Sequence, residues 1–513
     1  MKHTIWLLWD HLHHDHRLLT TARPDTHRIL MIESRTAGTR FRYHTHRLIL
    51  LYSAMRHRAQ QLSAEGWQVD YHRLSDEKNA TSTALAQHAQ RFGTESFHLI
   101  APTEYTMREA VPMLARKISV PIHMHPDDLF LCSREEFARF AKNKRRLLME
   151  HHYRNMRKKL GLLLTAEGKP EGGAWNFDRY NRAGIREYRR AGSPQAPPPP
   201  WCTPDEITRH VIDDVKRYFP GHPGDPDTFR LPVTRSQALQ WLAHFIRHRL
   251  PLFGTYEDLI TEKDPLLFHS MLTPFLNCGL LRPLECCQAA IAAYRCGAAP
   301  LNAVEGFVRQ IIGWREFVNG IYWEKMPDYL HCNALEAHRP LPRWISTADT
   351  RMACMRHAIQ QLLSCGYTHH IQRLMVLGNF FLLTEAHPRL VLRWYHEMYI
   401  DSFEWVMAAN VLGMILHADG GYMATKPYAA TAAYLHKMSD HCEHCYYRHD
   451  LKSGPGSCPF NSLFWRFWHK HRERFRSNAR VKSLLTAWDN RPQSERDSIL
   501  QTAEEYLRNI DQI

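Results

Sequence analysis

Three cysteines in one short stretch near the C-terminal end are the clearest candidates for metal chemistry. Cys442, Cys445 and Cys458 follow the spacing C-x2-C-x12-C, which is one thiolate short of a closed four-sulfur site. The fourth ligand is expected among the other cysteines of the helical region: Cys278, Cys286, Cys287, Cys296, Cys332, Cys354 and Cys365. Spacing does not choose among these, nor between zinc and an iron–sulfur cluster, since four thiolates suit both. Buried cysteines without a metal are the simpler alternative.

Two adjacent histidines suggest acid–base chemistry. His369 and His370 lie in GYTHHIQRLMVLGNF, whose periodicity is helical. Neighbours in a helix point about 100° apart, so only one of them can readily face a pocket. Histidine titrates near neutral pH and can exchange a proton, although two packed or capping histidines are the plainer interpretation. The stretch HLHHDH at 11–16 could bind a metal, but a tract of this kind is more often solvated.

Composition predicts a chain of two domains with an affinity for polyanions. Its 513 residues exceed what one compact core holds. The 66 basic and 52 acidic residues give a net charge of +14, for which nucleic acid is the usual partner and a merely basic surface the alternative. No apolar run reaches the roughly 18–20 residues that span a bilayer, and the N-terminus lacks a signal-peptide pattern. We therefore expect no membrane contact, a bacterial cytoplasmic location and reduced thiols.

The elements that position these residues change in character along the chain. Short apolar runs in the first part indicate strands that alternate with helical segments: 4–9, 28–33, 67–74, 96–101 and 120–124. Such alternation predicts a parallel sheet with helices on both faces. No G-x-G-x-x-G follows the first strand, so ordinary dinucleotide binding there is not supported.

Two features mark the domain boundaries. The stretch 133–164 is highly basic and helical, and its charges could contact nucleic acid or solvate a helix face. The segment AGSPQAPPPPW at 191–201 is a linker, because four consecutive prolines forbid helix. Beyond about residue 226 nearly every periodic segment is helical. We predict an α/β Rossmann-like domain at 1–131, an interdomain helix and proline-rich linker at 132–225, and an all-α domain at 226–513.

Four longer segments carry a family resemblance. They are DGGYMATKPYAATAAYLHKMSDHCEHCYYRHDLKSGPGSCPFNSLFWRFW, MEHHYRNMR, GGAWNFDRYNR and GYTHHIQRLMVLGNF. They closely resemble the iron–sulfur bacterial cryptochromes and photolyases, the prokaryotic (6-4) photolyase group, and the resemblance covers essentially the whole chain. In that family the fourth thiolate lies in a T-x-M-x-C pattern, here Thr350, Met352 and Cys354. The resemblance thus implies a [4Fe-4S] cluster on Cys354, Cys442, Cys445 and Cys458.

The resemblance also implies a light-driven flavoenzyme that repairs (6-4) photoproducts in DNA. FAD would lie in the all-α domain, where an arginine can neutralise its pyrophosphate. By the family pattern its contacts are Tyr256, His269, Ser270, Thr273, Asn277, Gln310, Trp314, Arg315, Arg373, Asn379, Asp401, Glu404 and Asn410. His370 would donate a proton to the lesion, and His369 would support it.

An electron relay and an antenna belong to the same resemblance. The relay would use Trp394, Tyr395 and Trp344, in an aromatic cluster with Tyr399 and Trp405. Where the family commonly has a Trp and a Gly before Thr350, this chain has PRWISTADT, so the relay is shortened unless Trp344 substitutes.

The antenna, 6,7-dimethyl-8-ribityllumazine, would lie in the α/β domain. Asp10 and Glu33 follow the first two strands at the carboxyl edge of the predicted sheet, where open α/β sheets bind ligands. His44 and Leu51 follow in the next helix. Ordinary loop polarity is the alternative for each of these residues.

UV-damaged DNA is the expected partner of a monomer associated with the nucleoid. The lesion would be flipped into the cavity, and arginines at its mouth would hold phosphates: Arg154, Arg157, Arg179 and Arg182. Two alternatives remain open. One is a cryptochrome-like blue-light photoreceptor with the same cofactors. The other is a non-photochemical nucleic-acid-binding protein with an iron–sulfur domain, such as a primase subunit, which would contain no flavin.

Overall fold

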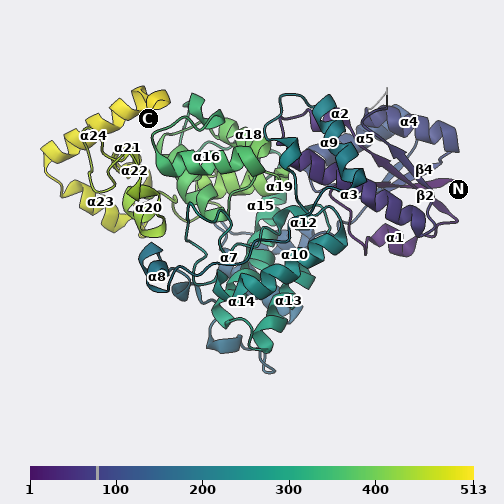
Figure 1. Ribbon diagram of the computed structural model, residues 1–513, viewed down its shortest axis with the longest axis horizontal. Coiled ribbons are helices and arrows are strands. Elements are labelled where there is room, and N and C mark those ends of the chain that lie inside the picture. Colours follow the sequence, from purple (N-terminus) through teal and green to yellow (C-terminus); the bar gives the residue numbers. More distant parts are fainter. Residues whose placement is uncertain (77–79) are drawn as a thin grey trace.

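A five-stranded parallel sheet forms the core of the N-terminal part of this computed structural model, which describes residues 1–76 and 80–513 (Figure 1). The strand order is β3-β2-β1-β4-β5. The strands are β1 (His3–Leu7), β2 (His27–Ile32), β3 (Val69–His72), β4 (Ser96–Ile100) and β5 (Ile122–His125). The predicted α/β domain is therefore confirmed, with each strand displaced from its predicted bounds by a few residues.

Helices cover both faces of this sheet because alternate side chains of each strand point in opposite directions. Ile5 and Ile29 pack in one core with residues of α3 (Thr45–Ala64), whereas Trp6 and Leu30 pack in another with α4 (Thr81–Phe92) and α5 (Tyr105–Ile118). Two short helices complete this part, α1 (Arg17–Thr21) and α2 (Arg35–Gly38).

The basic segment that was predicted as one helix is broken in two. Helix α6 (Arg134–Ala141) begins with a capping box between Ser133 and Glu136, and α7 (Met149–Leu160) follows after a gap. The break lies where Lys142 leaves helical geometry and Asn143 takes a positive φ of 61°. A left-handed residue cannot continue an α-helix, which ends the first helix there.

The proline-rich stretch is not helical, as predicted, but the region around it contains two helices. These are α8 (Ile185–Arg190) and α9 (Glu206–Tyr218). Helix α9 packs along α3, where Tyr52 and Phe219 stack and Arg56 pairs with Asp214 at 2.5 Å. Helix α9, which lies within the predicted linker region, therefore packs against the α/β domain (Figure 1).

The remainder of the chain is helical, as predicted, and Figure 1 shows its last helices at the end of the molecule farthest from the sheet. Its helices are α10 (Arg235–His248), α11 (Leu250–Phe253), α12 (Thr273–Asn277), α13 (Pro283–Arg295), α14 (Leu301–Val308), α15 (Glu316–Lys325), α16 (Ala353–Cys365), α17 (Asn379–Leu383), α18 (Pro388–Met398), α19 (Glu404–Ala408), α20 (Ala432–Met438), α21 (Pro459–Lys470), α22 (Arg472–Phe475), α23 (Lys482–Asp489) and α24 (Gln493–Arg508). Within the described ranges, no helix is long and apolar enough to cross a membrane.

Three π-helical segments interrupt this helical domain. They are η4 (Arg309–Arg315), η7 (Gln372–Gly378) and η8 (Ala409–Ile415). A π-turn inserts one extra residue into a helix, which changes the direction of nearby side chains, and such turns are frequent at functional sites. All three segments contribute side chains to one cavity.

Candidate functional site

A cavity of about 230 Å³ lies at the centre of the helical domain, between the three π-helical segments and α12. Most residues that were predicted to bind flavin line it: His269, Ser270, Thr273, Asn277, Gln310, Trp314, Arg315, Arg373, Asp401 and Asn410. These residues come from sequence positions up to 141 apart, so the tertiary fold brings together side chains that the sequence scatters.

An ion pair between Arg373 and Asp401 forms part of the cavity wall. The two guanidinium nitrogens Nη1 and Nη2 each donate to a carboxylate oxygen at 3.1 Å. Thr273 donates to the same carboxylate at 2.6 Å, and Asn277 donates to the backbone oxygen of Asp401 at 3.0 Å. The Arg373 guanidinium also lies 4.0 Å from the centre of the Tyr399 ring. The pair is thus fixed from several sides.

Other buried polar atoms of the cavity have no partner in the protein. They include Nε and Nη2 of Arg315, Oδ1 of Asn277 and Nε1 of Trp405. Arg315 pairs with Glu316 at 3.0 Å through Nη1 alone, and its guanidinium lies against Phe130 and Trp405. Buried donors and acceptors are nearly always satisfied, so these atoms fit a ligand with an anionic group and a polar edge, as a flavin nucleotide has.

Three predicted flavin contacts lie outside this cavity. Tyr256 stacks on Phe268, and it is its neighbour Glu257 that lines the cavity. Asn379 exchanges two hydrogen bonds of 3.0 Å with the backbone of Ala430.

Glu404 belongs to the contact between the two domains instead. Its carboxylate accepts hydrogen bonds from Arg40 at 2.9 Å, Thr106 at 2.7 Å and Tyr322 at 2.5 Å. Its chain neighbours Trp405 and Val406 do line the cavity. The Glu404 side chain itself is buried against the α/β domain and is bonded there.

Sequence analysis also missed Glu257 as a cavity residue. Burial raises the pKa of its carboxyl to about 8, so this side chain is mainly protonated at neutral pH and can donate a hydrogen bond. Its Oε2 is buried without a partner. No sequence pattern indicated Glu257, because only the tertiary structure determines which side chain of this turn faces the cavity.

The two adjacent histidines separate, but not as neighbours in one helix as predicted: His369 precedes the helical segment, which begins at His370. His370 lines the cavity and is open to it, whereas His369 is buried and stacks on His269 with ring centres 4.2 Å apart. The cavity walls desolvate the ring of His370 and lower its pKa to about 4, while burial lowers the pKa of His269 to about 3. Both rings are therefore neutral at pH 7 in the free protein.

Aromatic rings lead from the cavity toward the far side of the domain. Tyr399 stacks on Tyr395 with centres 5.2 Å apart, and Tyr395 lies 5.3 Å from Trp394. Phe381 contacts both Tyr395 and Trp394, at 6.4 and 5.5 Å. The predicted relay residues Trp394 and Tyr395 are therefore adjacent to each other.

Trp344 joins the same series of rings through two phenylalanines. It lies 5.3 Å from Phe380, which in turn lies 6.2 Å from Phe381. The Trp344 indole is buried and donates to the backbone oxygen of Ile510 at 2.8 Å. The upstream tryptophan thus occupies a position in contact with the aromatic series.

The four cysteines of the predicted cluster come together at one place although 104 positions separate the outermost two. Cys354 is in the first turn of α16, Cys442 in a 3-10 turn, and Cys458 at the N-cap of α21. Burial raises the pKa of Cys354, and the nearby Cys458, Cys445 and Cys442 raise it further. All twelve cysteines are free thiols. As the side chains stand, no group of three or more His, Cys, Asp or Glu residues at 1–76 and 80–513 could hold a metal ion.

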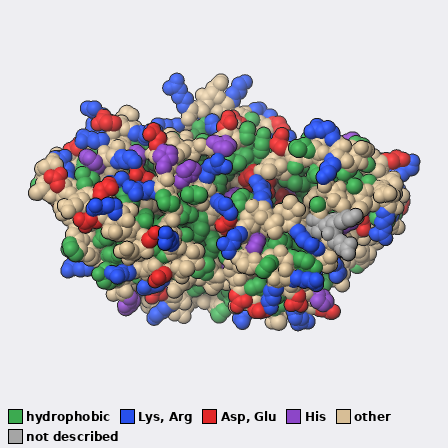
Figure 2. Space-filling view, turned by 90° about the horizontal axis from the view of Figure 1, so that it is seen from above, with side chains coloured by type: hydrophobic (Ala, Val, Ile, Leu, Met, Phe, Trp, Pro, Cys, Tyr) green, Lys and Arg blue, Asp and Glu red, His purple; other side chains and the backbone are tan. Residues whose placement is uncertain are grey.

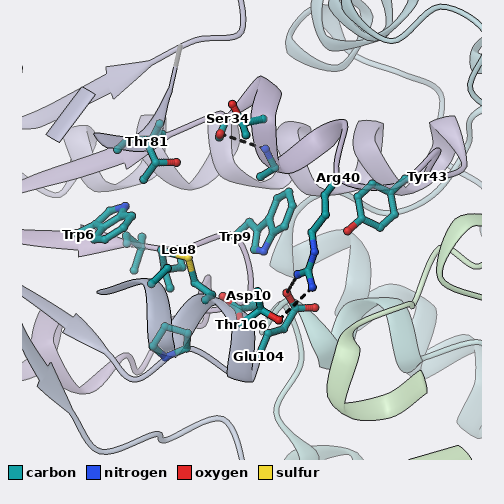
Figure 3. A pocket seen from close by; sticks show the side chains of 17 residues that line it. Trp6, Leu8, Trp9, Asp10, Ser34, Arg40, Tyr43, Thr81, Glu104 and Thr106 are labelled. Carbon is teal, nitrogen blue, oxygen red and sulfur yellow. Dashed lines mark hydrogen bonds and ion pairs between the residues drawn. The ribbon is translucent and has the colours of Figure 1, made fainter. Parts of the chain in front are cut away.

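A second cavity, of about 450 Å³, opens at the carboxyl edge of the sheet (Figure 3). Asp10, which was predicted to contact the antenna, lines this cavity. Its carboxylate accepts a hydrogen bond of 2.5 Å from the hydroxyl of Thr103. Sequence analysis did not identify its other prominent side chains: Trp6, Trp9, Arg40, Tyr43 and Glu104. Figure 3 shows Trp9 between Trp6 on one side and Arg40 and Tyr43 on the other, with Glu104 next to Arg40.

The other three predicted antenna residues lie outside that cavity. Glu33 is fully buried and accepts hydrogen bonds from Arg56 at 2.7 and 2.8 Å and from Tyr71 at 2.6 Å, so it stabilises the domain. His44 caps α3 and contacts the α16 side of the helical domain, and Leu51 is buried in the core. Glu33 and His44 are direct chain neighbours of the lining residues Ser34 and Tyr43, but their own side chains are engaged elsewhere.

The predicted DNA-binding arginines differ in their availability. Arg157 is buried, and it donates to the backbone oxygens of Leu162, Leu163 and Trp175, so it cannot reach a phosphate. Arg154, Arg179 and Arg182 are exposed or partly exposed, although Arg154 pairs with Glu150 and Arg182 with Asp178. Figure 2 shows Lys and Arg side chains spread over one whole face, with Asp and Glu among them.

Comparison with known proteins finds close relatives. A family described as deoxyribodipyrimidine photo-lyase-related protein matches residues 5–231. A (6-4) photolyase of Agrobacterium fabrum is 41% identical over 94% of each chain. Two solved structures share the fold at a TM-score of 0.54: a class III photolyase from Agrobacterium tumefaciens, at 14% identity over 99% of this chain and 98% of that one, and a cryptochrome from Synechocystis, at 12% identity with the same coverage.

Proposed function

The chain belongs to the cryptochrome/photolyase family, in the group of the bacterial (6-4) photolyases, and from this premise we propose that it repairs (6-4) photoproducts in DNA with light. One observation carries the proposal: a single deep cavity joins the Arg373–Asp401 pair, the unsatisfied Arg315 and the accessible His370. This combination suits a site that holds an anionic redox cofactor beside a proton donor.

FAD fits the residues of this cavity. When bound and excited by light in its reduced form, it would supply the single electron that the repair needs. Arg315 would bind the pyrophosphate with the guanidinium nitrogens that have no partner in the protein. Asn277 and Asn410 would orient the cofactor through their amide groups, and the Arg373–Asp401 pair would set the charge beside its ring system.

His370 would provide the proton that accompanies the transfer of a hydroxyl between the two pyrimidines. In the free protein its ring is neutral, because desolvation lowers its pKa to about 4. DNA phosphates at the mouth of the cavity stabilise the imidazolium form and raise that pKa when the lesion enters. The histidine would thus be charged mainly in the complex, where its proton is needed.

A [4Fe-4S] cluster is the best match for the four thiols that meet at α16 and α21. A single zinc ion holds four sulfurs within about 4 Å of each other, since Zn–S bonds are about 2.3 Å, whereas a four-iron cluster occupies the space between more widely separated thiolates. Cys354 is near enough to Cys442, Cys445 and Cys458 for their charges to raise its pKa, and the family resemblance favours the iron–sulfur cluster over zinc. The cluster would join the C-terminal helices to the rest of the helical domain.

The cavity at the sheet edge would hold the antenna, 6,7-dimethyl-8-ribityllumazine. Trp6 and Trp9 offer aromatic surfaces for a flat ring system, and Asp10, Arg40 and Glu104 offer partners for its polar edge and ribityl chain. We propose these residues in place of Glu33, His44 and Leu51.

The decisive experiment measures repair of DNA that contains a single (6-4) photoproduct, with the reduced protein under blue light and in the dark. Repair that depends on light supports the proposal, and no repair by flavin-loaded, reduced protein contradicts it. A cryptochrome-like photoreceptor with the same cofactors would show flavin photochemistry without repair.

A further inference from the structure

Glu257 brings a carboxyl group without a protein partner into the wall of the flavin cavity. It lies in the turn between α11 and α12 and lines the cavity. Among residues 1–76 and 80–513, no group forms a hydrogen bond or an ion pair with this carboxyl, and its Oε2 is enclosed. Buried polar groups are almost always satisfied, so an exception in the wall of a cavity indicates a contact with a ligand.

The charged groups around Glu257 do not provide it with a counter-ion. Those that face it are Asp178, Arg182, Asp258, Glu305 and Arg309. Arg309 is shared between Glu305 at 3.2 Å and Asp178 at 3.3 Å, and Arg182 pairs with Asp178. Both arginines are therefore committed to other carboxylates, and an ionised Glu257 would add a fourth negative charge to this part of the wall.

Glu257 is accordingly a neutral acid at pH 7. Burial raises the pKa of its carboxyl to about 8, and the carboxylate of Asp258 acts in the same direction while Arg309 opposes it. A protonated carboxyl carries one O–H donor, whereas the ionised form only accepts hydrogen bonds. The wall of the cavity thus contains a donor that disappears when this group ionises.

The backbone of Glu257 also fixes the tautomer of His269, which lines the same cavity. Nε2 of His269 lies 3.0 Å from the backbone oxygen of Glu257. A carbonyl oxygen only accepts, so Nε2 carries the proton of this ring. Burial lowers the pKa of His269 to about 3, and Nδ1 of the neutral ring is therefore an acceptor. His269 offers the cavity an acceptor, and Glu257 offers it a donor.

This pair adjoins the proposed proton donor His370. The His269 ring stacks on His369, the chain neighbour of His370, and the charge of His370 would lower the pKa of His269 further. Glu257 is thus connected through His269 to the part of the wall where the lesion would receive its proton. A ligand group that contacts Glu257 here belongs to the lesion rather than to the pyrophosphate, which Arg315 would bind.

We propose that Glu257 is a specificity-determining residue for the lesion: as a neutral carboxylic acid it donates a hydrogen bond to a carbonyl oxygen of the flipped pyrimidine pair. Pyrimidine carbonyls accept hydrogen bonds, and a flipped base is read through such contacts. Bases that stay stacked in undamaged DNA do not reach this donor. Glu257 takes this role only if the cavity receives the lesion, so the role rests on the proposed function.

The neutral form is essential because the partner is a polyanion. An ionised carboxylate would repel the DNA phosphates and the lone pairs of the carbonyl oxygen, and it would have no proton to donate. Phosphates at the mouth of the cavity raise the pKa of Glu257 further, so the acid stays protonated in the complex. Preference for damaged DNA should therefore be constant below about pH 7.5 and fall as pH rises through about 8 to 9.

The test measures the affinity of the flavin-loaded, full-length protein for a duplex with a single (6-4) photoproduct and for the same duplex without it, in the dark, from pH 6.5 to 9.5 at constant ionic strength. The ratio of the two dissociation constants reports the preference for the lesion. In the wild type we expect it to fall about fivefold to tenfold between pH 7 and pH 9. Glu257→Gln, which is neutral at every pH and keeps an N–H donor, should hold its pH 7 ratio at pH 9.

Glu206→Gln is the matched control, because it removes an exposed carboxylate on α9 and should show the wild-type fall. An infrared difference spectrum of the wild type provides a second measurement that needs no variant. The C=O band of a protonated carboxyl should shift when the damaged duplex is added and stay in place with the undamaged one.

A preference for the lesion that does not change with pH in the wild type would overturn the proposal. An equal fall in Glu257→Gln, or a flavin content of that variant below half of the wild type, would also overturn it, since the acid would then not read the lesion or would serve the cofactor. Light-dependent repair would persist in each of these cases. No repair at any pH would instead contradict the proposed function itself.

Discussion

Asp401 accepts both hydrogen bonds of the Arg373 guanidinium at 3.1 Å, and the same carboxylate accepts the hydroxyl of Thr273 at 2.6 Å. The guanidinium is also fixed by Thr368, whose backbone oxygen accepts from Nε at 2.7 Å. A charged pair held by this many partners cannot move to accommodate a ligand. It therefore acts as a rigid element of the cavity wall, against which a cofactor is placed.

Replacing Asp401 by Asn should remove flavin and destabilise the domain. Arg373 would lose its counter-charge in a buried place, which typically costs about 3–5 kcal/mol. We expect flavin content below about one tenth of the wild type, which corresponds to about 1.4 kcal/mol or more of binding free energy. Absorbance of released flavin per chain measures it. Asp450→Asn, which breaks the exposed pair with Arg448, is the control and should keep its flavin.

Replacing His370 by Ala should abolish repair without loss of flavin. General acid catalysis contributes about 10²–10⁴-fold, and we expect a rate loss in that range. Single-turnover repair of (6-4) DNA under saturating light measures it, with flavin content checked in parallel. The exposed His210→Ala should repair at the wild-type rate. Normal repair by flavin-loaded His370→Ala would exclude this histidine as the proton donor.

Buried neutral histidines should make the fold sensitive to acid. Burial lowers the pKa of His44, His269 and His396 to about 3 and that of His370 to about 4, whereas an unfolded histidine titrates near 6.5. Between these values the unfolded state binds more protons, so the free energy of unfolding falls as pH falls from about 6.5 toward 4, by about 1–2 kcal/mol per histidine at pH 5.

Urea unfolding at a series of pH values measures this dependence. The variant His396→Gln should flatten the slope by nearly one proton over that range, because it removes a ring that stacks on Phe41 and stays neutral in the fold. His210→Gln should leave the slope unchanged, since an exposed histidine has similar surroundings in both states. A slope that is the same in all three proteins would contradict this account.

Replacing Cys354 by Ser should release the iron and reduce the yield of soluble protein. Cys354 is buried at the start of α16 and is the one proposed ligand outside the C-terminal segment, so its loss would open the cluster. Iron and acid-labile sulfide per chain should fall from about four to near zero. Cys296→Ser, at an exposed cysteine, should keep the wild-type content. Full iron in Cys354→Ser would identify a different fourth ligand.

Substitution of two arginines on α7 should differ in its effect on stability. Arg157→Ala leaves the backbone oxygens of Leu162, Leu163 and Trp175 without a donor and should destabilise the protein by about 2–4 kcal/mol, measured as the free energy of unfolding. Arg154→Ala should leave stability within about 0.5 kcal/mol, because its pair with Glu150 is exposed. If Arg154 contacts a phosphate, its loss reduces the slope of log affinity against log salt by about 1.

The fold class and the family could be read from the sequence, and both were confirmed. Short apolar runs such as those around Ile5 and Ile29 predict strands, because strands of a parallel sheet are buried on both faces. Most of the flavin contacts that the family resemblance implied line one cavity, since members of a family share a fold. The choice of His370 over His369 came from the family resemblance, and it is His370 that lines the cavity.

Side-chain direction was decided only by the tertiary structure. The sequence pointed to Glu404, Glu33 and Arg157 as ligand contacts, but each is held by protein partners that no local pattern reveals. His11, His13 and His16 are buried because the helical domain packs over a loop that is polar by composition. A sequence records the chemistry of each residue, while burial and hydrogen bonding depend on which other segments pack around it, and this is settled only when the whole chain folds.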